Sequence, residues 1–159
     1  MSWWKFWSDE EDEAASPDYY EEGVQLARRE KYHEALTSFR LALRESPENV
    51  AAMEQMAVVY TRIGMTDEAI KTYRRALEAD AESPGSHYGV AYLYLDRGQE
   101  EAARRHLEAF LENPPDEPQA NEHVRHARET LEELRGEQPS GTGPGGSPDA
   151  PSGEGQNRG

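Results

Sequence analysis

Residues 50–83 read VAAMEQMAVVYTRIGMTDEAIKTYRRALEADAES, and the pattern of this stretch repeats on both sides of it. Four columns of residues keep a period of 34. Small residues hold two of these columns: Gly23, Ala57 and Ala91, and Ala35, Ala69 and Ala103. Large residues hold the other two: Leu26, Tyr60 and Tyr94, and Phe39, Tyr73 and Leu107. A fixed period of this length indicates a stack of repeated supersecondary units.

Each repeat divides into two amphipathic stretches separated by a short polar break. These stretches predict three helical hairpins, with helices over 18–29 and 32–45, over 49–63 and 66–79, and over 84–96 and 100–112. Pro47, Pro84 and Pro114 lie at borders where one helix stops and the next starts. A hairpin of this size leaves an apolar face uncovered, so the units are expected to stack and share one core.

This pattern resembles the tetratricopeptide repeat family over about residues 16–115. The resemblance implies an all-α, right-handed solenoid of helical hairpins, with repeats at about 16–49, 50–83 and 84–117. Phe110 departs from the pattern, because alanine holds the same column at positions 42 and 76. It either loosens the third hairpin or packs on the segment that follows.

The segment Pro118–Arg135 has apolar residues along one helical face and charged residues elsewhere. It predicts a capping helix over 118–135, which completes a repeat domain over 17–135. The last residues, 136–159, hold eight Gly and four Pro and no aliphatic side chain larger than that of Ala150. Such a composition predicts a disordered tail, because too little apolar surface is present to offset the chain entropy of folding.

The resemblance implies that the first helix of each hairpin lines a concave groove that binds peptides. Family members that hold the acidic carboxylate tails of chaperones use a cluster of Lys, Asn and Arg there. Tyr20, Val24, Gln55, Gly85 and Gly89 stand at the corresponding places here, so we expect a partly apolar peptide instead. Packing within the stack is the alternative role of the tyrosines. The candidate groove residues are Tyr20, Val24, Arg28, Gln55, Val58, Arg62, Tyr88, Tyr92 and Leu95, and Ala27, Glu54 and Asp96 are expected on the same face.

The N-terminal segment, residues 1–16, combines an aromatic cluster with an acidic run over Asp9–Glu13. The aromatic residues are Trp3, Trp4, Phe6 and Trp7, which include every tryptophan of the chain. Because exposed apolar patches mark interaction sites, we expect this cluster to dock somewhere. Three destinations stay open: another protein, the concave groove of this chain or of a neighbour in a homo-oligomer, and a membrane surface. The neighbouring acidic run argues against the membrane.

The composition excludes several functional classes. The chain has 17 Lys and Arg against 32 Asp and Glu, a net charge of −15, which disfavours nucleic acid as a partner. It has no cysteine, no Gly-rich phosphate loop and no HExxH or GxSxG motif. His123 and His126 lie three residues apart on a polar helix and are expected to be solvated. We therefore expect no catalytic residue, metal or cofactor.

The predicted function is that of a non-catalytic adaptor or scaffold that binds a protein partner. The alternatives are a self-assembling module whose N-terminal aromatics dock in its own or a neighbour's groove, and a peripheral membrane adaptor. The sequence has no run of about 18 apolar residues that could span a membrane and no secretory leader pattern, so a cytoplasmic location is expected.

Overall fold

The structure is a computed structural model that describes residues 17–137, and all of its regular elements in that range are helices. The predicted N-terminal segment 1–16 and most of the predicted tail lie outside the described residues. The predicted helix ranges agree with the observed bounds to within two residues. The helices are α2 (Tyr19–Arg28), α3 (Tyr32–Glu45), α4 (Val50–Arg62), α5 (Thr66–Ala79), α6 (Pro84–Asp96), α7 (Glu100–Glu112) and α8 (Ala120–Glu137).

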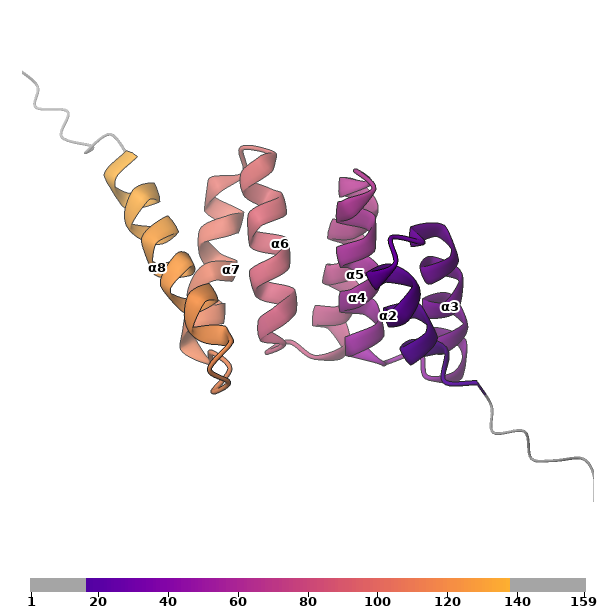
Figure 1. Cartoon of the computed structure of the whole chain (residues 1–159). Helices are drawn as coiled ribbons and strands as arrows, with labels where there is room; N and C mark the ends of the chain where they lie inside the picture. Colours follow the sequence, from indigo (N-terminus) through magenta and orange to yellow (C-terminus); the bar gives the residue numbers. More distant parts are fainter. Residues whose placement is uncertain (1–16, 138–159) are drawn as a thin grey trace, which may run out of the picture.

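Consecutive helices pair into three hairpins, α2 with α3, α4 with α5 and α6 with α7, and α8 follows the last hairpin (Figure 1). The first helix of each hairpin begins with a polar residue whose side chain accepts a hydrogen bond from a backbone N–H of the first turn. These N-caps are Asp18, Asn49 and Ser83. No helix within residues 17–137 is long and apolar enough to cross a bilayer.

Small residues allow the two helices of a hairpin to approach closely. A Cβ atom added at Gly23 of α2 would lie 2.6 Å from Cε1 of Phe39 in α3, so glycine makes room for the ring there. Ala35, Ala69 and Ala103 of the second helices are all completely buried. One core cluster therefore runs from the first hairpin into α6.

Phe110 resolves the departure noted in the sequence by packing on the segment that follows it. Its ring is 2 % exposed and belongs to a second buried cluster with Leu107 of α7 and with Ala127 and Leu131 of α8. The larger side chain thus meets the capping helix instead of a fourth hairpin.

The turn inside each hairpin has the same backbone conformation. The residue after the helix C-cap has a positive φ in all three: 60° at Glu30, 80° at Gly64 and 70° at Gly98. The next backbone N–H then bonds to the carbonyl five residues back, over 2.9 Å in the first turn and 2.8 Å in the other two. These are Schellman caps, in which glycine is the favoured residue because it adopts a positive φ without strain.

Glu30 is therefore the strained member of the set, which yields a prediction. Glu30→Gly should raise the free energy of unfolding by about 1 kcal/mol, because relief of the left-handed backbone outweighs the added freedom of the unfolded chain. Gly64→Ala should lower it by a similar amount, since nothing lies within 4 Å of an added Cβ and only the backbone is strained. Urea unfolding of both variants measures this. Equal stability of Glu30→Gly and the parent chain would contradict the assignment of strain.

Candidate functional site

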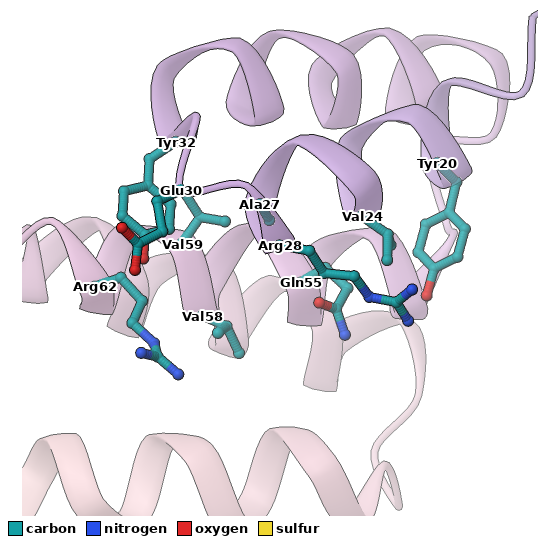
Figure 2. Close-up of a pocket in the computed structure, with 10 residues that line it drawn as sticks. All are labelled: Tyr20, Val24, Ala27, Arg28, Glu30, Tyr32, Gln55, Val58, Val59 and Arg62. Carbon is teal, nitrogen blue, oxygen red and sulfur yellow. The ribbon is translucent and has the colours of Figure 1, made fainter.

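The first of two adjoining hollows lies between the first helices of hairpins one and two. It has a volume of about 430 Å³ and collects six of the nine candidate residues. Figure 2 shows their side chains coming from α2 and α4. Its lining residues are Tyr20, Val24, Ala27, Arg28, Glu30, Tyr32, Gln55, Val58, Val59 and Arg62.

The second hollow, of about 450 Å³, continues from α4 to α6 and α8. Val58 and Arg62 line both hollows, which joins them into one surface that we call the groove. Leu95, the remaining candidate, is half-buried and lies outside the lining of both hollows. The second hollow is lined by Val58, Thr61, Arg62, Tyr73, Gly85, Tyr88, Gly89, Tyr92, Leu93, Asp96, His123 and His126.

Helix α8 holds the two candidate tyrosines of α6 in place. The Tyr88 hydroxyl lies 3.0 Å from Nδ1 of His126, and the Tyr92 ring stacks on the His126 ring at 4.8 Å. Thr130 donates its hydroxyl proton to the His126 carbonyl oxygen, so the Tyr92 hydroxyl, 3.0 Å away, is the donor to Thr130. Burial raises the pKa of Tyr88 to about 12. The tyrosines thus present ordered, neutral rings to the second hollow.

His123 and His126 belong to this wall and remain exposed, in agreement with the prediction that they would be solvated, but the sequence did not predict their contacts with the tyrosines of α6. His123 meets the Tyr88 ring edge to face at 4.8 Å. The i, i+3 spacing showed that the two histidines share one face of α8, but contact with α6 depends on how α8 is placed after the repeats.

Two glycines of α6 form the floor of the second hollow. A Cβ atom at Gly89 would lie 2.8 Å from Cε1 of Tyr73, and one at Gly85 would lie 2.7 Å from Oε1 of Glu54. Both neighbouring side chains therefore lie directly against the backbone of α6. Burial and the nearby charge of Glu54 raise the pKa of Tyr73 to about 12, so its hydroxyl stays protonated.

Glu54 joins the second hairpin to the third instead of facing the groove freely. Its Oε1 atom accepts hydrogen bonds from the hydroxyls of Ser83, at 2.5 Å, and Ser86, at 2.9 Å. Both serines are buried at the start of α6, where a carboxylate also interacts favourably with the helix dipole.

Two cations mark the first hollow of this acidic chain. The guanidinium groups of Arg28 and Arg62 are exposed and have no ion pair among residues 17–137. Each hollow also holds one carboxylate, Glu30 in the first and Asp96 in the second. The groove therefore offers unpaired positive charge at the α2–α4 end and tyrosine rings at the α6–α8 end.

A separate histidine pair connects α6 to α7. Nε2 of His87 donates to the Ala81 carbonyl oxygen at 2.8 Å, so Nδ1 of His87 is the acceptor for Nδ1–H of His106 at 2.9 Å. Burial lowers the pKa of His106 to about 4, and unfavourable electrostatic interactions of a protonated His106 ring with His87 and Arg105 add to the shift. Within the described residues, no group of three or more His, Asp or Glu is arranged to hold a metal ion.

Three stacked hairpins, a capping helix and a groove along the first helices define a repeat protein of the α-solenoid class. A family model described as tetratricopeptide repeat matches residues 26–84 and again 64–126, which together cover more than half of the chain. The chain belongs to the tetratricopeptide repeat family.

Curated relatives share this region. The chain is 36% identical over 85 residues to the TPR repeat-containing thioredoxin TTL4 of Arabidopsis thaliana, a match covering 54% of this chain and 12% of that protein. It is 32% identical over 84 residues to the photosystem I assembly protein Ycf3 of Prochlorococcus marinus, covering 51% of this chain and 49% of Ycf3. The match thus spans about half of Ycf3 and a small part of TTL4.

Solved structures share the fold at lower identity. The Yersinia enterocolitica type III secretion chaperone SycD, in complex with a peptide of the translocator YopD, superposes with a TM-score of 0.68. The two sequences are 19% identical, and the superposition covers 74% of this chain and 89% of SycD.

The Glu54 contacts predict a measurable coupling between the second and third hairpins. Glu54→Ala should lower the free energy of unfolding by about 2 kcal/mol, because it removes two hydrogen bonds to a charged acceptor. Glu108→Ala, at an exposed position on α7, is the control and should change stability by less than about 0.5 kcal/mol. Urea unfolding compares them, and equal small effects would show that the carboxylate does not couple the hairpins.

The lowered pKa of His106 predicts acid sensitivity. The fold favours the neutral ring, so its contribution to stability is complete above pH 6.5 and is lost as the pH falls toward 4. His106→Gln should therefore lose less stability than the parent chain between pH 7 and pH 4.5. His33→Gln, on the exposed surface, is the control. Parallel decline of all three proteins in thermal or urea unfolding would exclude His106 as the source.

Proposed function

We propose that this chain is a non-catalytic scaffold that binds a partly apolar peptide of a partner protein in the groove. The observation that carries the proposal is the exposure of Val58, an aliphatic side chain 39% exposed in the wall shared by both hollows. An exposed apolar residue inside a hollow with a few polar groups is typical of a binding surface.

The family membership and the relatives support this proposal. SycD has been solved with a peptide of another protein, and its fold covers most of this chain. The name of Ycf3 likewise describes an assembly protein. The groove brings tyrosine rings, Val58 and two arginines to one surface, which suits recognition of an extended peptide by a few anchors.

The aromatic residues Trp3, Trp4, Phe6 and Trp7 are the second binding element of the proposed scaffold, as a short docking motif. They lie outside the described residues, and the destinations to be distinguished are a second protein, the groove of this chain or of a neighbouring copy, and a membrane. A cytoplasmic location for the scaffold is part of the same proposal.

A peptide selection tests the groove. Peptides selected from a random display library on the full-length chain should bind with Kd values in the micromolar range, as for a small interface. Val58→Asp should weaken them at least ten-fold, because a loss of about 1.4 kcal/mol is expected when a carboxylate replaces a buried aliphatic contact. Fluorescence anisotropy with labelled peptides measures the affinities.

Met65→Asp is the matched control. Met65 is the other large apolar residue exposed within residues 17–137, it lies outside both hollows, and it precedes α5 at a position where Asp is a good N-cap. Its variant should bind with unchanged affinity. Equal binding by both variants, or failure to select any peptide, would refute the proposed function.

A further inference from the structure

We propose that residues 3–13 of the chain dock in the groove of the same molecule and compete there with outside peptides. This inference rests on the proposed function, because it takes the groove to be a peptide-binding surface. It adds an occupant: the aromatic cluster in the second hollow and the acidic run Asp9–Glu13 beside Arg28 and Arg62.

The second hollow suits aromatic side chains. Its wall consists of the Tyr88 and Tyr92 rings, whose hydroxyls are already engaged by α8, and of Val58 and Leu93. The Tyr73 ring, which lies against the backbone of α6 at Gly89, is a further aromatic ring in its lining. Aromatic rings bury about 150–250 Å² each and gain roughly 0.5–1.5 kcal/mol more from contact with other rings. The N-terminal cluster supplies four such rings within five residues.

The first hollow suits the acidic run. Arg28 and Arg62 are exposed and lack ion pairs among the described residues, whereas Asp9–Glu13 places five carboxylates in succession. In a chain with a net charge of −15, unpaired cations in a hollow are the places where a carboxylate is attracted. Arginine also pairs with carboxylates in a bidentate geometry.

The acidic run and the aromatic cluster follow one another along the chain in the same order as the arginines and the tyrosines along the groove. Pro17 adjoins α2, whose Tyr20 lines the first hollow. The acidic run lies 4–8 residues before Pro17 and the aromatic cluster 10–14 residues before it. At about 3.3 Å per extended residue, these segments reach roughly 13–26 Å and 33–46 Å.

These reaches cover the groove. Packed helices lie about 8–10 Å apart, and α2 contacts α4, which contacts α6, so α6 is roughly 20 Å from α2. A segment that extends from Pro17 across the groove therefore reaches the arginines of α2 and α4 before it reaches the tyrosines of α6. A tether this short gives an effective concentration on the order of mM, so a weak contact suffices within one molecule.

Intrinsic tryptophan emission of the full-length chain tests the docking, because every tryptophan lies in the segment. The parent chain should emit with a blue-shifted maximum that is constant over a thousand-fold dilution. The double variant Arg28→Glu, Arg62→Glu should shift the maximum to the red. The control Arg44→Glu, Arg74→Glu reverses the same charge at two exposed arginines that lie outside both hollows, and it should leave the maximum unchanged.

Competition gives a second measurement. A fluorescein-labelled peptide of residues 1–14 should bind a full-length variant with Trp3, Trp4, Phe6 and Trp7 changed to Ala. It should bind the parent chain about ten-fold more weakly, as expected for a Kd near 100 μM and a tethered competitor at mM effective concentration.

Four outcomes would overturn the inference. The first two are a red tryptophan emission maximum in the parent chain and a blue-shifted maximum that the Arg28→Glu, Arg62→Glu variant leaves unchanged. The third is a maximum that moves to the red on dilution, which indicates docking in a neighbouring molecule. The fourth is a blue shift that occurs only with neutral phosphatidylcholine vesicles, which indicates contact with lipid. A failure of this inference can be distinguished from a failure of the proposed function. If library peptides still bind the four-alanine variant and depend on Val58, the groove binds peptides and only its internal occupant is wrong.

Discussion

The close approach of helix backbones to aromatic rings sets the geometry on which the rest of the structure depends. Gly23 lets α2 lie against Phe39, and the buried alanines at positions 35, 69 and 103 allow the same proximity from the second helices. Because side chains pack densely, a methyl group added at Gly23 would overlap the Phe39 ring, and the ring or the helix would have to shift. The first helices are thereby held side by side, and the groove is the surface that this arrangement leaves uncovered.

The helical part of the fold could be predicted from the sequence because it follows from local, repeated signals. The 34-residue period, the apolar spacing and the prolines at helix borders predict the helices, and the structure agrees to within two residues. Glu30 shows how strongly the repeat governs conformation. It adopts the positive φ that glycine adopts at the equivalent turns, so the requirement for a Schellman cap overrides the preference of the residue.

The candidate site could be predicted only in part, because some of its contacts do not follow the period. Six of the nine candidate residues gather in the first hollow, since their placement needs only the helical face of α2 and α4. The roles of His123, His126 and Glu54 could not be predicted, since they depend on contacts between residues 29–38 positions apart in sequence. Helix α8 has no counterpart among the repeats, so no equivalent repeat position indicates which residues it contacts.

The second hollow arises because the residues at two equivalent repeat positions differ between hairpins. Phe39 packs on Gly23 of its own hairpin, but the equivalent of Gly23 in the next hairpin is Ala57, which has a Cβ. The equivalent ring, Tyr73, instead lies against α6, where Gly89 stands in the column that Gln55 holds one repeat earlier. The pair Ala57 and Gly89 thus moves one aromatic ring from a hairpin interior to the boundary between hairpins. Tyr73 thereby lines the second hollow together with Tyr88 and Tyr92, which α8 holds in place, and this aromatic hollow adjoins the two unpaired arginines.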